Sequence, residues 1–180
     1  MRQSFLPLGL VLIVLTLLSC GEQTRSVAEE AVTTEADLAA LGQSQEQSVE
    51  EAVHRFVDQT IEYVKTQQGA KFAGQYAPDL TASKDGRWIA DTDTYVAEFG
   101  EAVSEIRVHA YAWMHRKIYV LAPDAAVFVG MASVTASFGS SDARLDYDLA
   151  WTLLLKQKDG MWRIVHEHTS HLWHEPAAEQ

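Results

Sequence analysis

Residues 159–170, Asp-Gly-Met-Trp-Arg-Ile-Val-His-Glu-His-Thr-Ser, decide the fold of this chain. The Asp-Gly pair supplies the positive backbone angles of a tight turn, and the residues after it are typical of a β-strand. Similar segments precede it, separated by turn-forming residues such as Pro123-Asp124. We therefore expect an antiparallel meander of four long strands, at 106–121, 125–138, 144–157 and 161–170.

Helical patterns come before these strands. Ser48 and Glu51 form a capping-box pair ahead of apolar residues at helical spacing, which predicts an amphipathic helix ending near Gly69. The remaining predicted elements are a short helix at 70–76 stopped by Pro78, a hairpin at 80–89 and a helix at 94–104 capped by Thr92 or Asp93. Helices followed by a meander indicate an α+β domain, with the helices on one face of a curved sheet.

Alternation along two strands predicts which side chains face the core. In the segment 144–157 the inner set is apolar: Leu145, Tyr147, Leu149, Trp151, Leu153 and Leu155. In the preceding strand the expected inner set becomes polar toward one end: Val127, Val129, Met131, Ser133 and Thr135.

The strand at 106–121 has no clearly polar face. On one side lie Val108, Ala110, Ala112 and Met114, and on the other His109, Tyr111 and Trp113. Both faces of this strand should therefore be buried. On the convex side of a single curved sheet, a second subunit or the C-terminal tail would have to bury them. We favour a homodimer through this surface.

The ending at 159–170 resembles the closing strand of the SnoaL-like branch of the nuclear-transport-factor-like superfamily, and that of the association domain of calmodulin-dependent kinase. The resemblance covers roughly residues 48–172. It implies a cone-shaped, cystatin-like α+β barrel, in which a curved antiparallel sheet wraps around N-terminal helices and leaves a pocket, commonly in a homodimer. Because such folds serve many functions, the fold alone does not determine what this chain does.

By comparison with the kinase association domain, Glu167 and Thr169 point into that pocket. A carboxylate among apolar groups has a raised pKa, which suits a general acid or base. Glu167 could instead form an ion pair with Arg163 on the same strand face. The expected pocket residues are Ser133, Tyr147, Trp151, Thr169, Met131, Leu149 and Tyr76.

Four histidines lie near the C-terminus: His166, His168, His171 and His174. Two imidazoles on one strand face could share a metal, but a three-ligand site needs another well-placed group. Because His-x-His is part of the resembling family's strand ending, we favour structural packing and expect no metal. The sequence contains no cofactor motif, and we expect no cofactor.

The N-terminal residues resemble a bacterial lipoprotein signal. Arg2 and an apolar run at 5–18 precede Leu-Leu-Ser-Cys, a lipobox-like sequence ending at Cys20. We expect residues 1–19 to be a signal peptide, Cys20 to carry lipid, and the protein to face the periplasm, anchored to a bacterial membrane that we expect to be the outer membrane. Residues 20–47 are then an acidic, flexible tether, 48–174 the folded domain and 175–180 a disordered tail.

The net charge of -11 makes nucleic-acid binding unfavourable. Two hypotheses about function remain. We favour a membrane-anchored, non-catalytic lipoprotein that binds a small hydrophobic ligand or acts as an assembly module. The alternative is an isomerase, cyclase or hydrolase acting on a small hydrophobic substrate, with Glu167 as acid or base.

Overall fold

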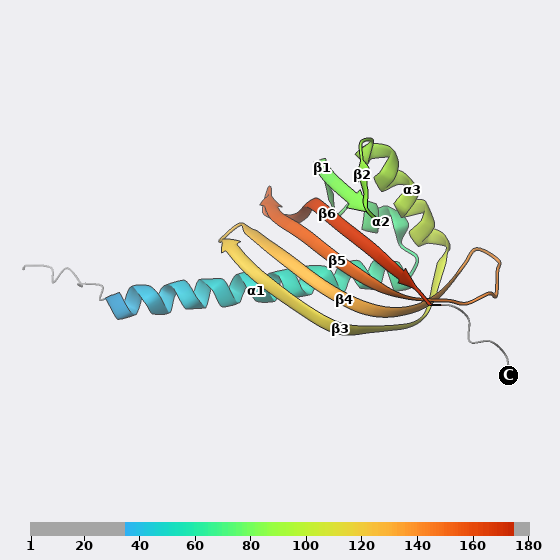
Figure 1. Ribbon diagram of the computed structural model, residues 1–180. Coiled ribbons are helices and arrows are strands. Elements are labelled where there is room, and N and C mark those ends of the chain that lie inside the picture. The colour runs from blue at the N-terminus through green and yellow to red at the C-terminus, as the bar shows by residue number, and fades with distance from the viewer. Residues whose placement is uncertain (1–34, 175–180) are drawn as a thin grey trace, which may run out of the picture. The chain divides into compact units, whose positions relative to one another are not determined.

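The computed structural model describes residues 35–174, which fold into an α+β domain (Figure 1). The predicted signal, Cys20 and the C-terminal tail lie outside the described residues. In chain order the elements are α1 (Glu35–Lys65), α2 (Gly69–Ala73), β1 (Tyr76–Lys84), β2 (Arg87–Ile89), α3 (Thr92–Glu105), β3 (Ile106–Ala122), β4 (Ala125–Phe138), β5 (Leu145–Lys158) and β6 (Met161–Trp173). The predicted elements are therefore present in the predicted order.

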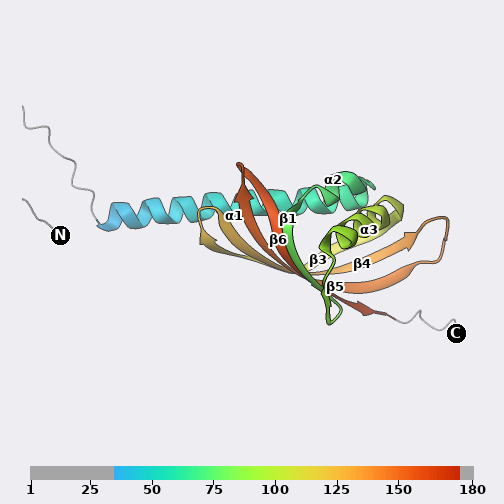
Figure 2. The same cartoon turned by 90° about the horizontal axis from the view of Figure 1, so that it is seen from above.

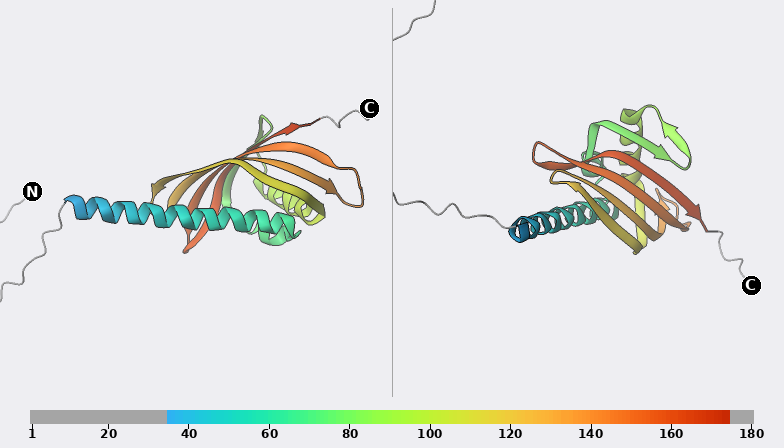
Figure 3. Two further views of the ribbon diagram at one scale, coloured as in Figure 1. Left: turned by 90° about the horizontal axis from the view of Figure 1, so that it is seen from below. Right: turned by 60° about the vertical axis from the view of Figure 1, so that its left-hand side comes forward.

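The strands form one six-stranded sheet in the order β2-β1-β6-β5-β4-β3. The meander β3 to β6 and the hairpin β1–β2 are antiparallel, as expected. The pairing of β1 with β6 is parallel and was not predicted. The sheet is strongly curved and arches over the helices, which all lie on its concave side (Figures 2 and 3).

Several boundaries differ from the sequence prediction. Helix α2 ends at Ala73 with Gly74 as its C-cap, rather than at residue 76, and Pro78 lies inside β1, which begins at Tyr76 rather than at residue 80. Helix α1 begins at Glu35 rather than Ser48, so residues 35–47, expected to belong to a flexible tether, are helical. Their Ala, Leu, Glu and Gln content favours a helix, and residues 39–48 stay exposed until Val49, the first buried position. The cap of α3 is Asp91, whose carboxylate accepts a 3.0 Å hydrogen bond from the Thr94 backbone N–H, rather than Thr92 or Asp93.

The helices pack closely on the concave face. Val53 and Val57 of α1 are almost fully buried against the sheet. Gly69 at the start of α2 touches Gly100 of α3, and a Cβ at Gly69 would lie 1.9 Å from the Gly100 carbonyl oxygen. Glycine is needed there because the two backbones approach so closely.

The inner face of β4 is the opposite of the one predicted. The inward positions are Ala126, Phe128, Gly130, Ala132, Val134 and Ala136, whereas Val129, Met131 and Ser133 are exposed on the convex face. Both faces of β4 carry apolar residues, so alternation alone could not decide between them. The small inward side chains leave room for aromatic rings: a Cβ on Gly130 would lie 2.6 Å from the Trp113 ring.

The inner face of β5 agrees with the prediction. Tyr147, Trp151, Leu153 and Leu155 are buried, and Leu149 is partly buried. At the strand's first residue the pattern fails, since Leu145 is exposed. Together with α1 and α3, this face of β5 encloses a cavity.

Candidate functional site

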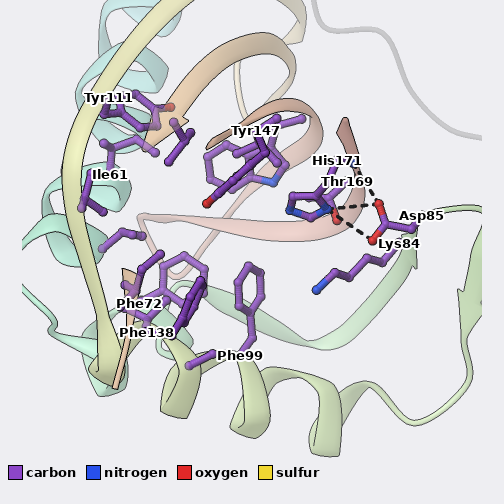
Figure 4. Close-up of a pocket in the computed structure, with 18 of the residues that line it drawn as sticks. Ile61, Phe72, Lys84, Asp85, Phe99, Tyr111, Phe138, Tyr147, Thr169 and His171 are labelled. Carbon is purple, nitrogen blue, oxygen red and sulfur yellow. Dashed lines mark hydrogen bonds and ion pairs between the residues drawn. The ribbon is translucent and has the colours of Figure 1, made fainter. Parts of the chain in front are cut away.

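A cavity of about 240 Å³ lies between the concave face of the sheet and the helices (Figure 4). Most of its wall is apolar. Its lining comes from α1 (Ile61, Val64), α2 (Phe72), α3 (Phe99, Ala102, Val103), β3 (Ile106, Val108, Tyr111), β4 (Val134, Phe138), β5 (Tyr147, Leu149, Trp151), β6 (Thr169, His171, Trp173), Lys84 and Asp85. A mainly apolar lining with a few polar groups is typical of a small-molecule site.

Polar groups gather where β1 and β6 run side by side. Lys84 is paired with Thr169 in the parallel ladder, and the Asp85 backbone N–H donates a 2.9 Å hydrogen bond to the Thr169 carbonyl oxygen. Asp85 has a φ of +49°, which an Asp tolerates in a tight turn. The Asp85-Gly86 turn that was predicted as a simple hairpin therefore also brings a carboxylate to the cavity.

Asp85 holds His171 of β6 in place. Its carboxylate accepts a 2.9 Å hydrogen bond from the His171 backbone N–H and lies 3.1 Å and 3.3 Å from the ring atom Nδ1. Partial burial acts to raise the pKa of Asp85, but these hydrogen bonds outweigh it, so the pKa is lower than usual. Figure 4 shows the His171 ring between Asp85 and Tyr147.

Aromatic rings surround His171 on its other sides. Its ring stacks on Trp173 at 5.6 Å between centroids and lies 5.5 Å from the Tyr147 ring. Trp173 and Phe138 both line the cavity and are partly exposed, so they give its mouth an apolar rim. Such contacts restrict the imidazole to one orientation.

Two tyrosines line the cavity, Tyr111 from β3 and Tyr147 from β5. Burial raises the pKa of Tyr147 and also that of Tyr111, so both remain neutral hydrogen-bond donors over the ordinary pH range. The Tyr111 hydroxyl is buried and has no hydrogen-bond partner within residues 35–174.

Glu167 lies behind the cavity wall and does not line it. The residue is fully buried, and its carboxylate accepts hydrogen bonds from the Trp151 indole N–H at 2.6 Å and the Tyr95 hydroxyl at 3.1 Å. Burial raises the pKa of Glu167, and these hydrogen bonds offset part of the rise. The suggested ion pair with Arg163 does not form, since Arg163 donates to the Gly74 carbonyl oxygen.

The other predicted pocket residues are divided among several places. Tyr147, Leu149, Trp151 and Thr169 line the cavity. Tyr76 is buried behind it, beside a separate surface depression at Pro78 and Thr92. Met131 and Ser133 lie on the convex face, because the inner face of β4 was assigned incorrectly.

Sequence reasoning missed Lys84, Asp85 and His171 as site residues. Asp85 lies within the hairpin predicted at 80–89, and His171 is one of the four histidines near the C-terminus. Only the parallel β1–β6 pairing brings them together, and no local pattern predicts that pairing.

Two of the other C-terminal histidines, His166 and His174, make separate contacts. His166 Nδ1 lies 2.8 Å from the Thr81 hydroxyl, and His174 Nε2 lies 3.2 Å from Asp148. No cluster of three or more His, Cys, Asp or Glu side chains suited to a metal occurs within residues 35–174. Among the helices of that same range, none is both long and apolar enough to cross a membrane.

The model of one protein family, the SnoaL-like domain, matches residues 53–174. The chain belongs to this family. The match covers β1 to β6 and the helices that enclose the cavity, so the SnoaL-like domain contains the whole candidate site. No curated protein matches the chain.

Solved structures confirm the fold of the SnoaL-like domain. A Xanthomonas campestris protein described as a calcium/calmodulin dependent protein kinase II association domain is 21% identical, with a TM-score of 0.56 over 67% of this chain and 85% of that one. A ketosteroid isomerase-like protein from Erwinia carotovora atroseptica is 12% identical, with a TM-score of 0.57 over 68% and 95%. A hexachlorocyclohexane dehydrochlorinase is 10% identical, with a TM-score of 0.61 over 76% and 95%.

Proposed function

We propose that the SnoaL-like domain binds a small, mainly apolar molecule that carries a polar group such as a carbonyl. The observation that carries this proposal is the cavity of about 240 Å³, whose apolar wall has polar groups gathered at one end. The wall would desolvate the apolar body of the ligand, while Lys84, Thr169 or Tyr147 would donate a hydrogen bond to its polar group.

Two of the similar structures support this ligand class. Their names refer to ketosteroids and hexachlorocyclohexane, which are both apolar ring compounds. The likeness in fold does not transfer either substrate to this chain. The shared fold is consistent with a concave sheet that encloses an apolar ring compound.

The test is binding of three ketones of increasing size, 2-indanone, 2-tetralone and 2-acetylnaphthalene, followed by quenching of tryptophan fluorescence. Trp151 and Trp173 line the cavity and should respond to an occupant. We expect saturable binding of at least one ketone, with a Kd on the order of 0.1 mM. Absence of saturable binding by all three would overturn the proposal.

A variant that fills the cavity shows where the ketone binds. Ala102 of α3 lines the cavity, so Ala102→Trp should weaken binding at least about tenfold. Ala97 is an exposed residue on the same helix, and Ala97→Trp is the matched control with unchanged affinity. Equal affinities of these two variants would place the ketone elsewhere on the protein.

We also propose that the convex face of the sheet pairs two copies of this chain. Val129 and Met131 of β4 are exposed there, and Met114 is exposed on the neighbouring strand β3. Large apolar side chains exposed on a sheet face are typical of an interface. Light scattering of the purified protein at micromolar concentration should give a dimer, and a monomer would overturn this proposal.

Finally, we propose that residues 1–19 direct export and that lipid on Cys20 anchors the protein to a membrane facing the periplasm. The support is the signal-like sequence alone. Mass spectrometry of the peptide containing Cys20 from a bacterial host should show acyl chains, and Cys20→Ala should move the protein from the membrane to the soluble fraction. An unmodified Cys20 would overturn the proposal.

A further inference from the structure

Asp85 fixes the imidazole of His171 in the wall of the cavity. The inference drawn from this pair rests on the binding function proposed above. Asp85 binds His171 through both the backbone N–H and ring atom Nδ1. An ionised carboxylate is an acceptor only, so Nδ1 must carry the proton. The lone pair of the ring is therefore on Nε2, the nitrogen that a base uses.

His171 Nε2 is free to meet a ligand. The residue lines the cavity, its side chain is only 14% exposed, and Nε2 has no hydrogen-bond partner within the described chain. The other titratable or charged side chains of the cavity wall come from different elements: Asp85 from the β1–β2 turn, Lys84 from β1, Tyr111 from β3 and Tyr147 from β5.

Donors for a developing negative charge lie in the same cavity. The Tyr147 ring is 5.5 Å from the His171 ring, and Lys84 Nζ lies over the Phe99 ring at 5.6 Å from its centroid. Figure 4 shows His171, Lys84 and Thr169 at one end of the cavity, with Tyr147 beside His171. A base and proton donors thus converge on a mainly apolar space, the arrangement that proton abstraction next to a carbonyl group requires.

We propose that His171 is a general base that removes a proton from the carbon next to the carbonyl group of an apolar ligand, with Asp85 as its positioning residue. The C–H electron pair becomes the C=C bond of an enolate, and the carbonyl oxygen takes the negative charge. Tyr147 or Lys84 stabilises that oxygen through a hydrogen bond. The imidazolium then returns the proton to the same carbon or a conjugated one, so the net reaction is exchange or isomerisation and needs no co-reactant.

This assignment replaces Glu167 as the acid or base. Glu167 is fully buried, both carboxylate oxygens accept hydrogen bonds from the protein, and the residue does not line the cavity. The convergence of Lys84, Asp85 and His171 favours catalysis over the non-catalytic role expected from the sequence. A purely structural pair would tie the β1–β2 turn to β6 but would not accelerate proton transfer.

The experiment measures hydrogen–deuterium exchange at the α-carbons of the bound ketone in D₂O by ¹H NMR. At saturating ketone we expect exchange at least about 100-fold faster than with an equal concentration of free imidazole, and at least about a 100-fold loss in His171→Gln. The control is His168→Gln, an exposed histidine on the same strand, which should exchange like the wild type.

Binding and exchange are measured on the same samples, which separates the two proposals. Saturable binding with exchange no faster than imidazole, or with equal exchange in His171→Gln, overturns the base and leaves the binding site intact. Absence of binding by all three ketones overturns the binding function and the inference together. Melting temperatures show whether a variant is folded, and an unfolded His171→Gln is replaced by His171→Asn in the same comparison.

Asp85→Asn tests the positioning role. The Asn amide keeps the tight turn but can donate to Nδ1, which moves the ring proton to Nε2 and removes the base. At saturating ketone we expect at least about a tenfold loss of exchange, a shifted pH profile and partial recovery in Asp85→Glu. Exchange in Asp85→Asn with the wild-type rate and pH profile would overturn this role.

Discussion

The Trp151 indole N–H donates a 2.6 Å hydrogen bond to the carboxylate of Glu167, which is fully buried behind the cavity. Tyr95 donates a second bond to the other carboxylate oxygen. These donors connect α3, β5 and β6 and hold the Trp151 ring in the cavity wall. The largest effect on the Glu167 pKa is nevertheless burial, which raises it.

The raised pKa makes a prediction about stability and pH. The folded protein binds the Glu167 proton more tightly than the unfolded chain does, so this residue's contribution is full below the unfolded pKa, about 4.3. The contribution decreases as the pH rises through the folded pKa. Carboxylates with lowered pKa values, such as Asp79, Asp85 and Asp91, act in the opposite direction.

Glu167→Gln isolates this effect because Gln does not titrate and can still accept from Trp151. We expect the free energy of unfolding of Glu167→Gln, relative to wild type, to increase as the pH rises from 4 to 8. Urea unfolding across that range measures the difference. A difference that stays constant with pH would show that Glu167 titrates alike in the folded and unfolded states.

Helix packing predicts a cost for a single added methyl group. A Cβ at Gly69 would overlap the Gly100 carbonyl oxygen, so Gly69→Ala should lower the free energy of unfolding by about 1–3 kcal/mol. Gly42 lies in the exposed part of α1 with nothing within 4 Å of its Cβ position. Gly42→Ala should stabilise the protein by about 0.5–1 kcal/mol, and equal effects at both positions would contradict the packing argument.

The N-cap of α3 predicts a smaller effect. The Asp91 carboxylate accepts bonds from the Thr94 N–H and hydroxyl, which lower its pKa. Asp91→Ala should therefore destabilise the protein at pH 7, and by less as the pH falls through the folded pKa of Asp91. Asp91→Asn keeps a capping oxygen and is the control, measured by the same urea unfolding. A loss in Asp91→Asn as large as that in Asp91→Ala would argue against a capping role.

The proposed dimer makes a prediction at Met131, which is exposed on the convex face of β4. Met131→Asp would bury a charge in that interface, so we expect the dimer dissociation constant to rise at least about tenfold. Leu41→Asp, at an exposed apolar residue of α1, is the control. Sedimentation at several concentrations measures both, and equal dimerisation of the two variants would exclude the convex face as the interface.

The sequence by itself determined the order and type of the elements. Asp-Gly and Pro-Asp turns act over a few residues, so the four strands of the meander could be placed nearly to their ends. The inner face of β5 was predictable because polar and apolar residues alternate there, with Tyr147 and Trp151 on one side and Asp146 and Asp148 on the other. These signals need no knowledge of distant residues.

Only the tertiary structure decided which face of β4 is buried and which side chains meet at the cavity. β4 is apolar on both sides, so its facing depends on the pairing with β5 and the packing of Trp113 beside Gly130. Asp85 and His171 are 86 positions apart and meet through the parallel β1–β6 ladder. Turn and periodicity signals are local, whereas contacts between distant segments depend on how the whole sheet curves around the helices.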